Sequence, residues 1–220
     1  MIRKILVVLL CLVMAVSIAH AKKEKTTTIK DNIAVDKKYG WELPVPKNWK
    51  AKSQKEPNVE RLFMEKKNFM VNPFIQTYGG DYTIPRVLIF VQEFNGTVDD
   101  FQNLIMKSLE EHKTDNEIIK KLGLLQEGEY IISSDVLLES RPIKQIYLKR
   151  TYSRMLYITE GGGAMGGREE YINDNEVHEI YLIKLDNLIM VFQAYCEREF
   201  YEANSQEFES LIRSLKFPEN

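Results

Sequence analysis

Apolar positions are densest between residues 178 and 195, and their arrangement predicts the centre of the fold. Two runs rich in β-branched and aromatic residues, 181–185 and 188–192, flank Asp186-Asn187. Aspartate and asparagine both tolerate the positive φ of a two-residue hairpin turn. Only Lys184 interrupts the runs, and near-continuous apolar runs are typical of strands buried on both faces. The pattern predicts a central β-hairpin that is covered on each side by other structure.

Two further segments repeat their apolar residues with the spacing of a helix that buries one face. Residues 97–113 begin with Thr97, which can cap the first turn, and residues 201–215 lie close to the end of the chain. The two predicted stripes consist of Phe101, Leu104, Ile105 and Leu109 in the first segment and Phe208, Leu211, Ile212 and Leu215 in the second.

Shorter apolar runs predict strands at 41–43, 59–65, 84–94, 130–138 and 143–152, whereas 66–81 and 120–128 are interpreted as connections. Trp49 follows a proline turn and is expected to anchor the edge of the core. The chain shows no internal repeat and no interdomain linker. We therefore predict a single domain over residues 39–218, preceded by a flexible, polar lead-in over residues 22–38.

The first 21 residues have the pattern of a secretory signal peptide. Arg3 and Lys4 precede an uncharged run at 5–18 that is short for a membrane span. Ala19-His20-Ala21 supplies the small residues of a cleavage site, so we predict cleavage after Ala21 and an exported chain, periplasmic or secreted, that spans no membrane. An uncleaved anchor is the alternative, which the short run and the basic residues after it disfavour.

Charge and cysteine content exclude several partners and reactions. The whole chain has a formal charge of −2, and losing Arg3 and Lys4 with the leader would make it −4. Such a balance gives no general attraction to nucleic acid or to anionic lipid. With Cys11 removed, Cys196 would be the only cysteine, so no internal disulfide can form. Cys196 follows an apolar run, and we expect it to be a small buried residue.

No residue pattern in the chain specifies a reaction or a cofactor. After leader removal, His112 and His178 are the only histidines, and the chain has no G-x-S-x-G motif for a serine nucleophile. The chain also has too few histidines and cysteines for a zinc site built mostly from these residues. A hydrolase that uses carboxylates and His178 remains the alternative to a non-catalytic protein.

One acidic cluster could hold a divalent cation. Five of the seven residues at 161–167 are glycine, and oxygen ligands follow this segment. Its spacing matches neither a calcium-binding loop nor a phosphate-binding loop, so a charged, solvated surface next to a mobile loop is the simpler interpretation. The candidate ligands are Glu169, Glu170, Asp174, Glu176, His178 and Glu179.

The predicted domain opens with Tyr39-Gly40-Trp41, followed by Pro46 and Trp49, and closes with the segment 208–217. These residues and the order of the elements resemble the superfamily of PsbP subunits of photosystem II, Ran-binding Mog proteins and DcrB-like proteins. The resemblance implies an α+β fold, a single-domain α/β/α sandwich whose central, mainly antiparallel sheet is flanked by helices. The segment 161–167 matches nothing in that pattern.

The same resemblance implies an accessory or binding role rather than a shared reaction, and no catalytic residue carries over. Together with the missing catalytic pattern, it favours an envelope protein that binds a protein partner or a small ligand without a cofactor. The sequence sets no oligomeric state.

Overall fold

Seven antiparallel strands form the main sheet of the molecule. The computed structural model describes residues 24–69, 83–124, 128–138, 141–159 and 167–218. The predicted signal peptide and residues 161–166 of the glycine-rich segment lie outside these ranges. The strands of the main sheet are, in spatial order, β4 (Trp49–Ser53), β5 (Glu60–Lys66), β6 (Arg86–Glu93), β10 (Leu188–Glu197), β9 (Gly167–Leu185), β8 (Arg141–Thr159) and β7 (Gly128–Leu138).

The predicted hairpin is confirmed as the centre of this sheet. β9 and β10 pair antiparallel, with Leu185 opposite Leu188 and Asp186 at a φ of +49° in the turn. Alternate residues of β10 enter two separate cores: Met190 and Phe192 lie in one, and Ile189 and Val191 lie in the other. The hairpin is therefore buried on both faces because each face is covered by a different layer.

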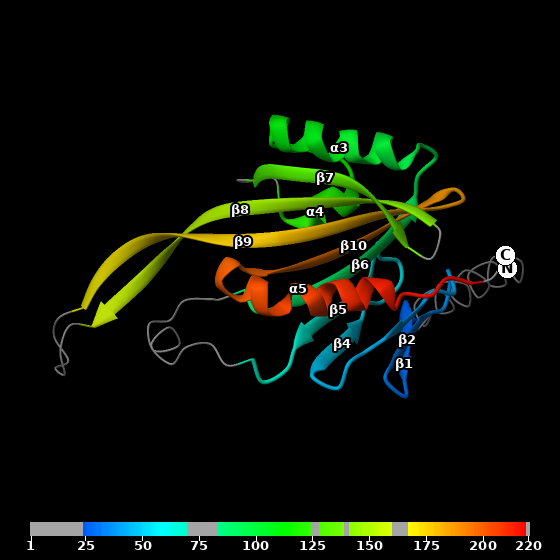
Figure 1. Cartoon of the computed structure of the whole chain (residues 1–220), viewed down its shortest axis with the longest axis horizontal. Helices are drawn as coiled ribbons and strands as arrows, with labels where there is room; N and C mark the ends of the chain where they lie inside the picture. Colours follow the sequence, from blue (N-terminus) through cyan, green and yellow to red (C-terminus); the bar gives the residue numbers. More distant parts are fainter. Residues whose placement is uncertain (1–23, 70–82, 125–127, 139–140, 160–166, 219–220) are drawn as a thin grey trace, which may run out of the picture.

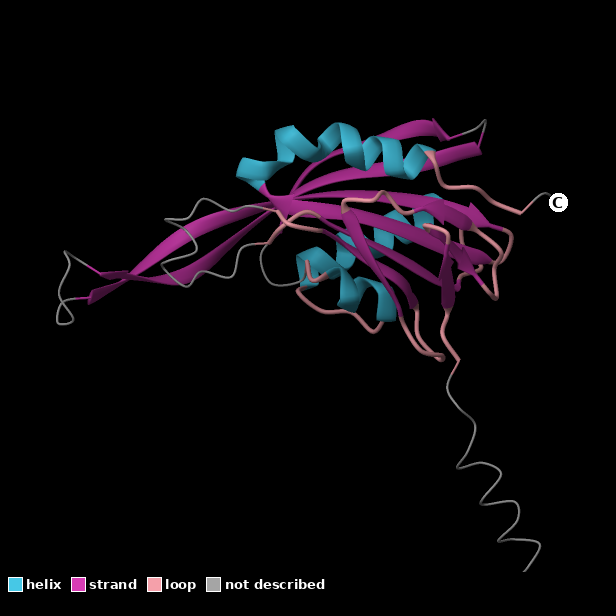
Figure 2. Cartoon of the chain, turned by 90° about the horizontal axis from the view of Figure 1, so that it is seen from below, coloured by secondary structure: helices cyan, strands magenta, loops and turns pink. Residues whose placement is uncertain are grey.

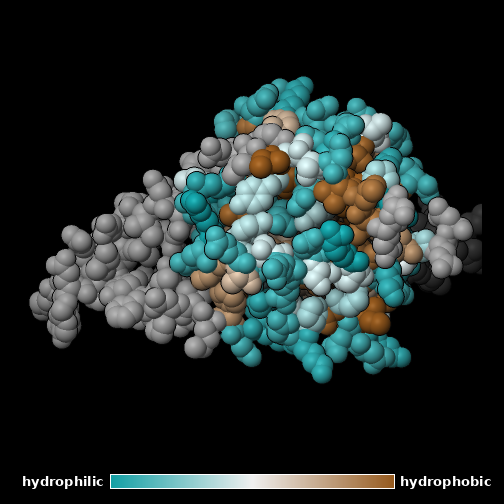
Figure 3. Space-filling view, in the orientation of Figure 1, coloured by the Kyte–Doolittle hydropathy of each residue, from teal (hydrophilic) through white to brown (hydrophobic). Residues whose placement is uncertain are grey.

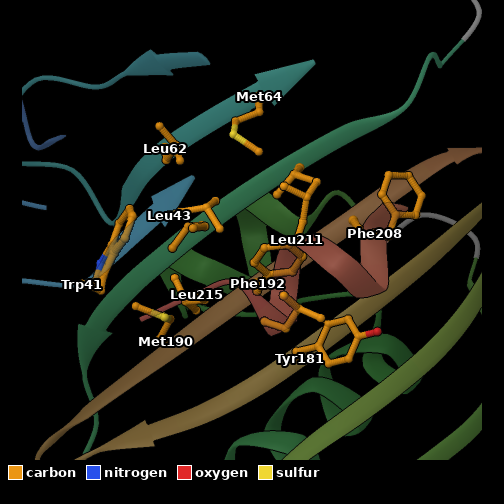
Figure 4. Packing of buried hydrophobic residues seen from close by; sticks show 14 of the residues in the cluster. Trp41, Leu43, Leu62, Met64, Tyr181, Met190, Phe192, Phe208, Leu211 and Leu215 are labelled. Atoms are coloured by element: carbon orange, nitrogen blue, oxygen red, sulfur yellow. The ribbon is translucent and has the colours of Figure 1, made fainter. Parts of the chain in front are cut away.

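Helices cover the two faces of the sheet, which confirms the α+β sandwich. Figure 2 shows α5 (Arg198–Arg213) on one side, with α3 (Val98–Glu111) and α4 (Glu117–Leu122) on the other. Leu211 of α5 packs in the same core as Phe192 of β10 (Figure 4). Trp49 is also buried there, as predicted.

Local capping explains where α3 and α4 begin. Thr97 and Asp100 form a reciprocal capping box at the start of α3, as the polar residues before its apolar stripe indicate. The segment 120–128 was predicted to be a connection, and this is wrong for its first residues, because α4 ends at Leu122. Asn116 caps α4 by accepting from the backbone of Ile118 and Ile119. A helix of six residues is too short to display a full periodic pattern.

A second sheet corrects the expectation of a flexible lead-in. β1 (Thr27–Lys30), β2 (Ile33–Asp36) and β3 (Glu42–Pro44) form three antiparallel strands. The buried guanidinium of Arg61 on β5 donates to Asp36, with Nε 2.8 Å from Oδ2. The hydroxyls of Thr26 and Thr27 donate to the carbonyl oxygen of Arg61. These buried polar contacts fasten a segment whose composition is otherwise typical of a disordered tail.

The hairpin of β8 and β9 extends well beyond the other strands. Its pairs continue from Thr151 and Asn175 to Thr159 and Gly167, where neither β7 nor β10 has a paired residue. Figure 1 shows this part as a two-stranded ribbon that projects from the body of the domain. The sequence predicted the paired strands at 130–138 and 143–152 but not the length of this ribbon.

Candidate functional site

The strand β9 carries the acidic residues that the sequence singled out, and it separates them. Glu176 and His178 lie on the face of the sheet covered by α3 and α4, and Glu179 lies on the face covered by α5. The side chains of Glu169, Glu170 and Asp174 lie outside the described part of the structure. Among the side chains that are described, no group of three or more His, Cys, Asp or Glu residues is arranged to hold a metal ion. The metal site therefore stays a prediction.

Glu176 belongs to a buried polar network. Its carboxylate accepts from the hydroxyl of Thr83 and from Arg150, with Nη1 3.1 Å from Oε2. Nε2 of His178 lies 3.2 Å from the same Oε2. Burial opposes the charged carboxylate, but the hydrogen bonds from His178 and Thr83 and the charge of Arg150 outweigh it and lower the pKa of Glu176 to about 2.

The partners of His178 fix its protonation state. Nε2 of Gln193 donates to the carbonyl oxygen of Leu122 at 3.0 Å and lies 3.0 Å from Nδ1 of His178. A carboxamide nitrogen can only donate, so Nδ1 must accept and the proton of the neutral ring sits on Nε2, facing Glu176. Burial lowers the pKa of His178 below its usual range, which agrees with this neutral form.

The surroundings of His178 are those of a residue that supports the fold. Its side chain is only 2% exposed, and its ring stacks on Tyr195 with centroids 5.0 Å apart. In the described structure, both ring nitrogens of His178 face protein groups, so neither is available to a substrate. Cys196 is also buried, as predicted, and burial, with the charges of Glu197 and Glu179, raises the pKa of its thiol to about 12.

The opposite face of β9 lines a cavity of about 330 Å³ beneath α5. We name it the α5 cavity. It lies between α5 and the strands β7, β8 and β9, and its volume falls within the range of small-molecule sites. The lining residues are Val136, Leu137, Leu138, Ile143, Gln145, Glu179, Tyr181, Tyr201, Ser205, Gln206, Glu209, Ile212 and Arg213.

The polar end of the α5 cavity is built around the carboxylate of Glu179. The hydroxyl of Tyr181 donates to Oε2 at 2.8 Å, and the hydroxyl of Tyr201 donates to Oε1. Nε2 of Gln145 donates to the hydroxyl of Tyr181 at 3.1 Å. These contacts hold two phenols and one carboxylate in fixed positions on the cavity wall, although Glu179 itself is only 5% exposed.

The charge of Glu179 acts on the tyrosines around it. Burial and then this charge raise the pKa values of Tyr147 and Tyr181 above their usual range. Burial and the hydrogen bond to Glu179 do the same for Tyr201. The phenols therefore stay protonated and donate throughout the physiological pH range.

Aliphatic side chains form the other wall of the α5 cavity. Ile143 and Ile212 are buried, whereas Leu137 is 66% exposed at the opening. The surface of the molecule on the α5 side shows apolar patches among polar side chains (Figure 3). An exposed leucine next to a polar cavity is an arrangement that a ligand with an apolar portion can cover.

Glu179 was among the residues predicted from the sequence, but the tyrosines around it were not. Tyr147, opposite Glu179 on β8, and Tyr201 on α5 contact each other with ring centroids 5.5 Å apart. Successive side chains of a strand point to opposite faces of the sheet, so Glu179 and His178 lie on different faces of β9. This separation could have been predicted from the sequence. The approach of Tyr201 depends on how α5 crosses the sheet, which no local pattern specifies.

None of the helices in the described ranges is both long enough and apolar enough to cross a membrane. No protein-family model matches the sequence, and no curated protein matches it.

Solved structures similar to this chain have low sequence identity. The cyanobacterial PsbP of Synechocystis sp. PCC 6803 is 8% identical, with a TM-score of 0.47 over 90% of this chain and 96% of that one. The Ran-binding protein Mog1p of Saccharomyces cerevisiae is 8% identical, with a TM-score of 0.44 and coverage of 89% and 96%. LpqN, involved in cell envelope biogenesis of Mycobacterium tuberculosis, is 13% identical, with a TM-score of 0.42 and coverage of 93% and 96%. The identities are 13% or less and the TM-scores are below 0.5, so these likenesses support no statement about the function of this chain.

Proposed function

We propose that this chain is an exported, non-catalytic binding module of the cell envelope. It holds a small ligand, or a side chain of a protein partner, in the α5 cavity. The observation that carries the proposal is the cavity itself, in which a fixed polar group faces an aliphatic wall. Binding sites commonly combine a mostly apolar lining with a few oriented polar groups.

The environment of the titratable groups supports a non-catalytic role. His178, which a carboxylate-dependent hydrolase would use as its base, is buried with both ring nitrogens directed at protein groups. A general base must come within hydrogen-bond reach of the proton it removes. In the α5 cavity, the phenols whose pKa values are raised are poor bases and poor nucleophiles near neutral pH.

The proposal is tested by blocking the α5 cavity. A library of small amines, alcohols, sugars and carboxylates is screened against the protein by ligand-observed NMR. Ser205 lines the cavity, so Ser205→Trp should fill it and remove the binding of hits found with the unmodified protein. Ser210→Trp is the matched control, because Ser210 is exposed on the same helix and does not line the cavity.

Hits that bind equally well to the Ser205→Trp variant would place binding elsewhere and contradict the proposal. A screen without any hit would contradict it for small ligands of these four classes.

A further inference from the structure

Among the described residues, the carboxylate of Glu179 has two hydrogen-bond donors but forms no ion pair with a cation. Both donors are neutral phenols, from Tyr181 and Tyr201. No ion pair joins Glu179 to a lysine or arginine in the part of the chain that the structure describes. A buried carboxylate without a positive partner is costly, so buried charges in proteins are usually paired.

Three other carboxylates with buried or half-buried side chains show the usual arrangement. Buried Asp36 pairs with Arg61, and buried Glu176 pairs with Arg150. Glu207 pairs with Lys66, with Nζ 2.6 Å from Oε2. Glu179 differs from these three because it lines a cavity that is large enough to admit a separate molecule.

The charged groups nearest to the α5 cavity do not neutralise Glu179. Arg213 at the rim is already paired with Glu209, with Nε 2.9 Å from Oε1. Arg198, at the start of α5, forms no ion pair with Glu179, and it lowers the pKa of Tyr147 by less than burial or Glu179 raises it. The polar end of the cavity is therefore negative.

We propose that the α5 cavity binds a primary ammonium group carried on an aliphatic stem. This inference rests on the proposed function and specifies the chemistry of its ligand. A carboxylate has about four lone-pair sites, and the two phenols occupy two of them. The remaining sites can accept from an ammonium group, which has only donors.

The rest of the cavity suits the remainder of such a ligand. The aliphatic stem would lie along Val136, Leu137 and Ile143, where burial of each methylene group favours binding. Tyr181 and Tyr201 also line the cavity, and an aromatic ring attracts a cation that lies over its face. A free alkylamine and the side chain of a lysine both present this chemistry.

The test compares three ligands of one length by isothermal titration calorimetry at pH 7: n-pentylamine, n-pentanol and n-pentanoate. The amine should bind the unmodified protein at least tenfold more tightly than the alcohol, and the carboxylate should bind most weakly. Glu179→Gln keeps the shape of the side chain and removes its charge, so the affinity for the amine should fall at least tenfold, to that of the alcohol. Glu110→Gln, an exposed change on α3 beyond the sheet, should leave all three affinities unchanged.

The outcomes separate this inference from the proposed function. If the alcohol binds as tightly as the amine and Ser205→Trp blocks both, the cavity is a binding site but the ammonium proposal is wrong. If none of the three ligands binds, the ammonium proposal is also wrong. The comparison of ligands uses the unmodified protein, so it stands even if Glu179→Gln fails to fold.

A last comparison identifies the source of the ammonium group. The tripeptide Ac-Ala-Lys-Ala-NH2 presents it as a lysine side chain, and Ac-Ala-Gln-Ala-NH2 is the neutral control. Tighter binding of the lysine peptide than of n-pentylamine supports a protein partner, and the reverse order supports a free amine. Equal binding of the two peptides would contradict recognition of the ammonium group on a protein.

Discussion

Tyr201 of α5 donates a hydrogen bond from its hydroxyl to Oε1 of Glu179 on β9, which joins the last helix to the centre of the sheet at the polar end of the α5 cavity. Hydrogen bonds to a charged acceptor contribute about 1.5–3 kcal/mol. Tyr201→Phe should therefore lower the free energy of unfolding by about 2 kcal/mol, measured by urea denaturation.

Tyr147→Phe is the matched control, since the hydroxyl of Tyr147 has no hydrogen-bond partner in the described part of the chain although its ring contacts Tyr201. This variant should change stability by less than about 0.5 kcal/mol. Equal losses in the two variants would show that the hydroxyl of Tyr201 is not the group that matters.

Leu211 fixes α5 to the sheet by an apolar contact. Its side chain is 3% exposed in the core that also contains Phe192 and Phe208. Leu211→Ala should lower the free energy of unfolding by roughly 2–5 kcal/mol, because it removes buried methyl groups and leaves a cavity. The neighbouring exposed change Ser210→Ala should cost less than about 0.5 kcal/mol. A similarly small loss for Leu211→Ala would mean that the helix is not docked in this way.

The ion pair between Asp36 and Arg61 should hold the small sheet against the large one. Among the described residues, Asp36→Ala leaves the buried guanidinium of Arg61 with Glu56 alone as a charged partner, so we expect a loss of about 3 kcal/mol. Hydrogen exchange of the β1 and β2 amides should become faster, while that of β10 amides should change little.

The double variant Asp36→Leu with Arg61→Met removes both charges and should recover part of this loss, because no unpaired charge remains buried. A double variant that is less stable by the sum of the two single losses would show that the charges do not interact.

Acid should destabilise the domain in two steps. The pKa of His178 is lowered by burial, so the unfolded chain binds a proton near pH 6.5 that the folded chain refuses, and stability falls as the pH drops below about 6.5. The pKa of Glu176 is lowered to about 2, so its contribution is complete above the ordinary value of 4.5 and is lost as the pH falls from 4.5 towards 2. That second step amounts to at most about 3 kcal/mol.

Thermal unfolding at intervals from pH 8 to pH 2.5 measures both steps. Glu176→Gln should be less stable at pH 7 and should lose most of the dependence below pH 4.5. A decline below pH 4.5 that is equally steep in this variant would assign the acid sensitivity to other carboxylates.

The central hairpin could be predicted because burial on two faces leaves a near-continuous apolar run such as 188–192. The helices α3 and α5 were equally visible, since each is long enough to repeat its apolar stripe. β1 and β2, with four residues each, were missed because their attachment depends on Arg61, a residue distant in sequence. The local amino-acid composition cannot predict a contact with a residue so distant in sequence.

The candidate site could likewise be predicted only in part. Glu179 was identified as an acidic residue, but the sequence grouped it with Glu176 and His178, which lie on the other face of β9. Its partner Tyr201 comes from α5, and the aliphatic wall includes Leu137 of β7. Only the packing of α5 across the sheet brings these residues together, and that packing is a tertiary property.

Methyl groups at known places in the fold allow binding in the α5 cavity to be located. Protein labelled with ¹³C at the isoleucine δ1 methyl groups is titrated with n-pentylamine and followed by NMR. Ile143 and Ile212 line the cavity, whereas Ile118 and Ile189 belong to the core on the opposite face of the sheet. We predict saturable shifts of the first pair and none of the second. Shifts of equal size in both pairs, or saturable shifts of the second pair alone, would contradict the assignment of the α5 cavity as the binding site.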